Sequence, residues 1–223
     1  MRLGLIESFG GPYFFNMIQH APSPGAAEAL AHIAAEEIGH GRMLLECLDP
    51  LGVEYRSAAR EQYVATAEAR KEALKLSDPG LNGPKSWEDV LAVTLLVDPA
   101  GILLVGARTM SQYGPLARVS AETLIEERDH AAYWEIWGKE ILASDEGRAS
   151  LQRSVDKVYP GAMGSLGRPE AGNTEFIIER EMGIWTIDPA ELQDILREML
   201  EVTLPPLGLR IPDLEPDYRN AFW

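Results

Sequence analysis

EIGH at residues 37–40 and ERDH at residues 127–130 repeat one Glu-x-x-His pattern in two distant parts of the chain. On an α-helix, residues three apart lie on the same face, so a glutamate and a histidine spaced in this way can bind one metal ion. A single pattern of this kind has low specificity. Two of them, using half of the chain's four histidines, indicate a metal site.

Both patterns belong to stripes of residues at alternating three and four spacing, which is typical of the inward face of a bundle helix. The first helix is expected to begin at Ser23-Pro24, an N-cap followed by proline, and to end at Asp49-Pro50. The turn Tyr113-Gly114-Pro115 precedes the helix that carries the second pattern. The two stripes consist of Leu30, Ile33, Glu37, His40, Leu44 and Cys47, and of Leu116, Ser120, Thr123, Glu127, His130, Trp134 and Trp137.

An acidic residue precedes each pattern on an expected helix of its own. Glu37 lies 30 residues after Glu7, and Glu127 lies 29 residues after Asp98. Burying a carboxylate without a partner is costly, so acids on inward stripes call for a cation or a donor. Two helices with one acid each and two with Glu-x-x-His form a two-metal carboxylate site. The predicted metal ligands and catalytic residues are Glu7, Glu37, His40, Asp98, Glu127 and His130.

The remaining sequence completes an all-α plan. Residues 51–85 form a long crossover that contains an exposed helix at about 58–74, and the next helix follows Ser86. Such a crossover between the second and third bundle helices is typical of a ferritin-like four-helix bundle. Shorter helices are expected at about 146–157 and 189–200, and an extended tail at 201–223. We expect a single domain, 1–223, with its bundle core at about 1–143 and the short helices and tail at 144–223.

Composition excludes several other classes of protein. The formal net charge of −15 argues against nucleic acids and anionic membranes as partners. One cysteine, Cys47, cannot form a disulfide framework. The first twenty residues do not resemble a signal peptide, and no apolar run approaches about 18 residues, so no membrane-spanning helix is expected. These features predict a cytoplasmic protein.

The ligand types also limit the identity of the metal. Nitrogen and oxygen ligands without a thiolate favour iron or manganese over structural zinc, and four carboxylates match two divalent ions. The expected cofactor is therefore two iron ions, with manganese possible. Gly10, Gly39 and Gly101 lie near the ligands in sequence, where they either leave room for dioxygen and substrate or allow close helix packing.

Several further motifs run along nearly the whole chain: EIGHG at 37–41, SWED at 86–89, LVD at 96–98, SQYGP at 111–115 with Ala117-Arg118, Glu126-Glu127 with His130, and LRIPD at 209–213. In these motifs the chain resembles the catalytic subunits of the phenylacetyl-CoA epoxidase family, which are ferritin-like di-iron oxygenases.

The resemblance implies dioxygen activation at two irons and the addition of one oxygen atom to an aromatic ring as an epoxide. It also implies a separate flavin and iron–sulfur reductase and a non-catalytic homologous subunit, in a homo- or hetero-oligomer. Two positions depart from the family. Ile33 stands where the family has a lysine and Leu104 where it has an asparagine, and in the family these two polar residues contact coenzyme A. Ile33, Gly101 and Leu104 are the expected substrate-binding residues. The substrate is expected to be a small aromatic or apolar molecule, and an acyl-CoA remains open.

Two other functions stay open at this point. One is a ferritin-like protein that handles metal or reduces peroxide without an organic substrate. The other is a scaffold subunit that binds metal only for stability. An apolar cavity at the metals favours the oxygenase, whereas an acidic channel and cage assembly favour metal handling.

Overall fold

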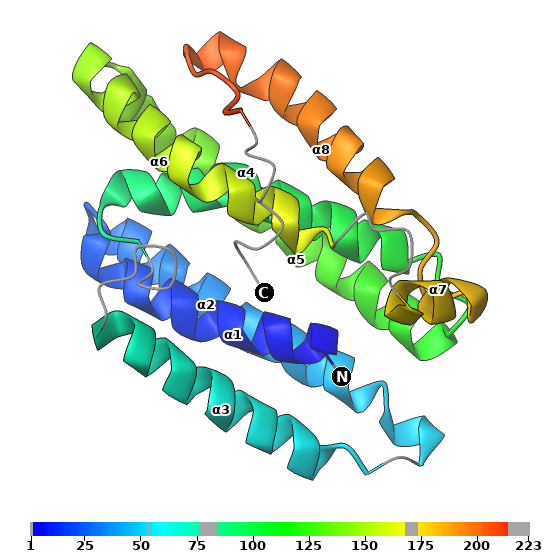
Figure 1. Cartoon of the computed structure of the whole chain (residues 1–223). Coiled ribbons are helices and arrows are strands. Elements are labelled where there is room, and N and C mark those ends of the chain that lie inside the picture. Colours follow the sequence, from blue (N-terminus) through cyan, green and yellow to red (C-terminus); the bar gives the residue numbers. More distant parts are fainter. Residues whose placement is uncertain (1, 53, 76–83, 168–173, 214–223) are drawn as a thin grey trace. The chain divides into compact units, whose positions relative to one another are not determined.

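The computed structural model describes residues 2–52, 54–75, 84–167 and 174–213. Within these residues the chain forms eight α-helices and no β-strand, so the all-α prediction is confirmed (Figure 1). The helix packing is consistent with a ferritin-like bundle. The helices are α1 (Arg2–Met17), α2 (Pro24–Glu46), α3 (Arg56–Lys75), α4 (Trp87–Arg108), α5 (Gly114–Leu142), α6 (Asp145–Ser165), α7 (Thr174–Glu181) and α8 (Pro189–Thr203).

The chain divides into two compact units, residues 1–87 and residues 88–223. The first unit contains α1, α2 and α3, and the second contains α4 to α8, with Trp87 at the boundary. Each unit therefore holds one of the two Glu-x-x-His patterns together with its upstream acid. The single domain expected for 1–223, with its core at about 1–143, stays a prediction.

In the first unit, α1 and α2 pack side by side as an antiparallel pair (Figure 1). Near the start of α1, Gly4 lies against Leu45, and near its middle Gly11 lies against Ile38 and the carbonyl of Ala34. A Cβ atom placed on Gly11 would come within 2.4 Å of Ile38 Cγ1, closer than real Cβ atoms approach. The small residues of α1 therefore let the two backbones approach closely, which aligns the side chains of one helix with those of the other.

The predicted start of α2 is confirmed. Ser23 is the N-cap, its Oγ accepts a hydrogen bond from the Ala26 N–H at 3.2 Å, and Pro24 occupies the first turn. The helix expected within the crossover is also confirmed as α3, and its side chains at 56–65 are exposed except Ala59. Ala59 and the preceding Tyr55 pack against Leu45 and Leu48. Residues 76–83 of the expected crossover lie outside the described residues.

In the second unit, a buried acid ties α4 to α6. Asp89 is only 7% exposed and accepts hydrogen bonds from Ser154 Oγ at 2.8 Å and from Lys157 Nζ at 2.9 Å. Glu88 and Asp89 also lie in the first turn of α4, where negative charge interacts favourably with the helix dipole. This network fixes the start of α4, the helix that carries Asp98.

The helix expected at about 146–157 extends further than predicted. It runs to Ser165 as α6, through Pro160, although proline removes one backbone donor. The added turns bury Tyr159 and Met163, and Leu166 directly after the helix is buried as well, each at most 1% exposed. Burial of this apolar surface outweighs the poor local helix propensity of proline and glycine, so the expected end at 157 was wrong.

The short helix α7 was not predicted, and its surroundings are tied to the α4–α5 connection. The carbonyl of Gly183 accepts hydrogen bonds from the Gln112 N–H at 2.8 Å and from Ser111 Oγ at 3.3 Å. Arg108, at the end of α4, lies over the Trp185 ring at 4.5 Å. These long-range contacts hold a segment whose own sequence gives little helical signal.

The predicted C-terminal helix is confirmed as α8, with Asp188 as N-cap accepting from the Ala190 N–H at 2.8 Å. The helix runs to Thr203 and a 3-10 helix follows at Pro205–Leu207, so the expected start of the extended tail at 201 was wrong. The described residues after it lie against α6. Arg210 donates to Asp156 Oδ2 at 2.7 Å, and Gln152 Oε1 accepts from the Arg210 N–H at 2.7 Å. Residues 214–223 of the expected tail lie outside the described residues.

Helix α4 is long and apolar enough, by length and composition, to cross a membrane. Asp98 divides its apolar sequence, which is why no uninterrupted apolar run of that length was recognised. Of its most apolar 18-residue window, 61% is buried within the protein. A buried core helix passes the same test, so α4 is consistent with a soluble protein.

Candidate metal centre

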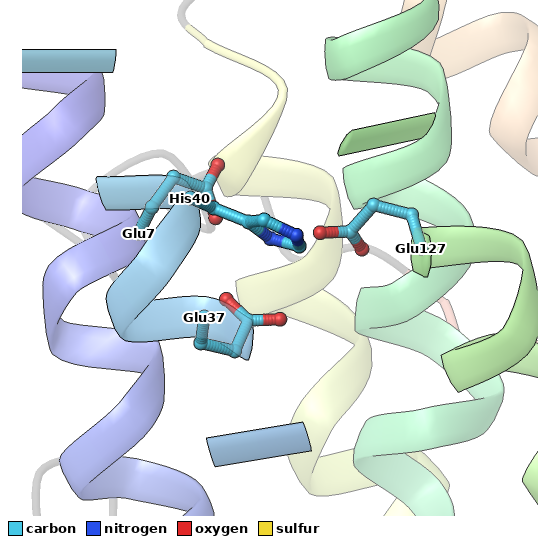
Figure 2. A group of neighbouring side chains, drawn as sticks. All are labelled: Glu7, Glu37, His40 and Glu127. Carbon is cyan, nitrogen blue, oxygen red and sulfur yellow. The ribbon is translucent and has the colours of Figure 1, made fainter. Parts of the chain in front are cut away.

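The first unit brings three of the six predicted ligands together. Glu7 of α1 and Glu37 and His40 of α2 each offer one ligand atom, and these atoms lie within 4.8 Å of one another. Figure 2 shows the Glu37 carboxylate and the His40 ring extending from the same side of α2. The three-residue spacing of the EIGH pattern therefore places the Glu37 and His40 side chains on one face of α2, as expected.

This cluster is set in an apolar stripe. His40 is fully buried and Glu37 is 6% exposed, while Glu7 is half-buried. Along α2, Leu30 and Ile33 are also fully buried. Apolar neighbours exclude water from the carboxylates, which makes an unneutralised charge at this place expensive.

The second unit carries the other three predicted ligands. Glu127 and His130 of α5 are 5% and 1% exposed, and Glu127 Oε2 lies 3.9 Å from His130 Nδ1. Asp98 of α4 is 6% exposed. The two helices meet beside these residues, since a Cβ atom on Gly101 would lie 3.3 Å from Glu127 Oε2. Asp98 precedes Gly101 by three residues and so lies on the same face of α4.

The cluster of Glu7, Glu37 and His40 in the first unit and the Glu127–His130 pair in the second both fit a metal ion by the chemistry of their donors. Each combines carboxylate oxygens with one imidazole and contains no thiolate, a set suited to iron or manganese. Each also buries acidic side chains, whose charge a divalent cation would offset. Figure 2 also labels Glu127, which belongs to the second unit.

The three expected substrate-binding residues lie in different settings. Ile33 is fully buried on α2, and Gly101 and Leu104 are half-buried on α4. The Leu104 carbonyl accepts a hydrogen bond from Arg108 Nη1 at 2.8 Å. Ile33 and Leu104 thus present aliphatic side chains, as the sequence requires, and their role towards a substrate stays a prediction.

Thr123 is a polar residue to which the sequence interpretation gave no role. It lies one turn before Glu127 on the inward face of α5 and is 1% exposed, and among the described residues its Oγ has no hydrogen-bond partner. A buried hydroxyl without a hydrogen-bond partner lowers the stability of the fold unless a ligand or a water molecule forms a hydrogen bond with it. The signal was present in the sequence, where Ser120 and Thr123 continue the stripe of Glu127.

An all-helical fold and buried carboxylate–histidine clusters define a helical protein with a possible metal site. The chain belongs to the phenylacetic acid catabolic protein family, whose model matches residues 2–221. This match does not distinguish the catalytic from the non-catalytic type of subunit. A search of curated proteins found no match.

Removing one ligand from either cluster tests the site. We expect His40→Ala and Glu127→Ala each to weaken iron binding at least about tenfold, because even outer-shell partners of a metal contribute that much. Iron per chain, measured after anaerobic loading with Fe²⁺ and desalting, reports the loss.

Matched controls exist on the same helices. His32 of α2 has a side chain that is 68% exposed and pairs with Glu36 at 3.1 Å, and Glu122 of α5 is exposed. His32→Ala and Glu122→Ala should keep the iron content of the unchanged chain. Full iron content in both ligand variants would contradict the assignment.

Proposed function

We propose that this protein is a di-iron oxygenase of the phenylacetyl-CoA epoxidase type, and that it is the catalytic kind of subunit. The observation that carries the proposal is that the two units contain the same kinds of candidate metal ligand. Each unit holds an acid on one helix and Glu-x-x-His on the next, and all of these residues are buried except Glu7, which is half-buried. Membership of the phenylacetic acid catabolic protein family supports the same chemistry.

In this proposal the two clusters combine into one dinuclear centre. Glu7, Glu37 and His40 supply one half of the ligands, and Asp98, Glu127 and His130 supply the other. The order of ligands along the chain supports this combination, because it is the order that builds two-metal carboxylate sites in four-helix bundles. A non-catalytic subunit has no need to keep six such residues at inward positions.

The iron pair would supply the activation of dioxygen, and the chain would supply binding, orientation and exclusion of water. The six ligands would hold the metals, while the buried aliphatic residues of α2 and α4 keep the surroundings dry. Two electrons and two protons are needed to reduce the second oxygen atom to water. A separate flavin and iron–sulfur reductase is the proposed source of the electrons.

The proposed substrate is a small aromatic or apolar molecule that approaches beside Ile33, Gly101 and Leu104. Partners would be the reductase and a non-catalytic homologous subunit, within a homo- or hetero-oligomer. The acidic composition, with a net charge of −15, supports a cytoplasmic protein that binds neither nucleic acid nor membrane.

Isotope incorporation tests the function. The iron-loaded chain, supplied with a flavin and iron–sulfur reductase and ¹⁸O₂, should transfer one ¹⁸O atom to an aromatic substrate, as measured by mass spectrometry. The Glu127→Ala variant should lose this transfer and Glu122→Ala should keep it. Consumption of peroxide with no labelled product from any aromatic acid, ester or thioester would favour the metal-handling alternative.

The aliphatic side chains of Ile33 and Leu104 predict that this chain binds coenzyme A thioesters weakly. Ile33 and Leu104 offer no hydrogen bond to a phosphate chain, and the net negative charge opposes its approach. Calorimetric titration of the chain alone with phenylacetyl-CoA should therefore show binding weaker than micromolar, with a smaller aromatic acid or ester preferred. A micromolar dissociation constant, about −8 kcal/mol, would contradict the role given to these two positions.

A further inference from the structure

In the first unit, a glycine lies directly against a ligand carboxylate. A Cβ atom on Gly10 of α1 would lie 2.5 Å from Glu37 Oε2 and 3.1 Å from Glu37 Cδ. Real Cβ atoms essentially never come within 3.0 Å of another heavy atom. The carboxylate of Glu37 therefore occupies space that any side chain at position 10 would take.

The second unit repeats this arrangement with a looser fit. A Cβ atom on Gly101 of α4 would lie 3.3 Å from Glu127 Oε2 and 4.0 Å from Glu127 Cδ. Gly10 follows Glu7 by three residues, and Gly101 follows Asp98 by three. In both units an acid-x-x-Gly sequence on one helix thus meets the glutamate of a Glu-x-x-His sequence on the next.

Other glycines of these helices do not share this contact. A Cβ atom on Gly39 or on Gly106 would meet nothing within 4 Å, and one on Gly11 would meet Ile38 and the Ala34 carbonyl. Gly11 therefore serves close helix packing, and Gly39 and Gly106 face open space. Contact with a ligand carboxylate distinguishes Gly10 and Gly101 from these three.

We propose that Gly10 and Gly101 are positioning residues that set where the Glu37 and Glu127 carboxylates lie and so control metal binding. The absence of a side chain lets each carboxylate lie against the opposite helix, on the face that carries the upstream acid. The inference rests on the proposed function, because it concerns the same ligands. It adds two residues that bind no metal themselves.

The contacts predict what an added methyl group would do. The atom nearest to a Cβ at position 10 is the far end of the Glu37 side chain, which can rotate away. The Glu37 Cβ, 3.3 Å away, needs a shift of only a few tenths of an ångström. Alanine also favours helix over glycine. Gly10→Ala should therefore keep or raise the melting temperature of the metal-free chain while weakening metal binding, a combination that a packing role alone would not produce.

Titration with Mn²⁺, followed by the electron paramagnetic resonance signal of the free ion, measures the effect. Gly10→Ala should bind Mn²⁺ at least about tenfold more weakly than the unchanged chain, as expected for a residue that orients a ligand. Gly101→Ala should show a smaller loss, because Glu127 needs to move only a few tenths of an ångström. Gly106→Ala, on the same helix, is the control and should bind as the unchanged chain does.

A double-mutant cycle ties the effect to the carboxylate. Adding Gly10→Ala to Glu37→Gln should weaken Mn²⁺ binding little further, since the charge that Gly10 positions is already gone. Unchanged affinity in Gly10→Ala, an additive cycle, or a lowered melting temperature of its metal-free form would overturn the inference. Failure of the unchanged chain to bind Mn²⁺ or Fe²⁺ would instead overturn the proposed function, and this inference with it.

Discussion

The charge of buried carboxylates is the constraint on which the rest of the structure depends. Glu37, Asp98 and Glu127 are each about 5–6% exposed, and a buried acid is tolerated only where a cation, a donor or a proton offsets its charge. Asp89 illustrates the structural solution, since Ser154 and Lys157 donate to it. The cluster of Glu7, Glu37 and His40 illustrates a different one, in which two acids and an imidazole lie within 4.8 Å of one another and a divalent cation would offset their charge.

Much of this could be predicted from the sequence because it depends on helical spacing. The stripe through Glu37 and His40, the cap at Ser23 and the start of α8 at Pro189 are local features, and each lies where the sequence indicated. The extension of α6 through Pro160 and the helix α7 were not predicted. Both depend on contacts with residues far away in the sequence, such as that of Arg108 with Trp185, and local propensity does not report such contacts.

The glycines near the candidate ligands show in the same way what the sequence alone does not predict. Gly10, Gly39 and Gly101 look equivalent in the sequence, since each lies within three residues of a candidate ligand. The structure separates them, because only a Cβ on Gly10 or on Gly101 would meet a ligand carboxylate, while Gly39 faces open space. Which glycine touches which acid is decided by the packing of one helix against another, and spacing along a single helix carries no information about it.

We propose that the six predicted ligands, three in each unit, bind two metals as one coupled centre. Mössbauer spectroscopy of the chain loaded with ⁵⁷Fe²⁺ and then oxidised tests it most directly. The account predicts two irons per chain in a diamagnetic ground state, because neighbouring ferric ions that share carboxylate ligands couple antiferromagnetically. Magnetically isolated ferric ions, or a single iron per chain, would contradict it.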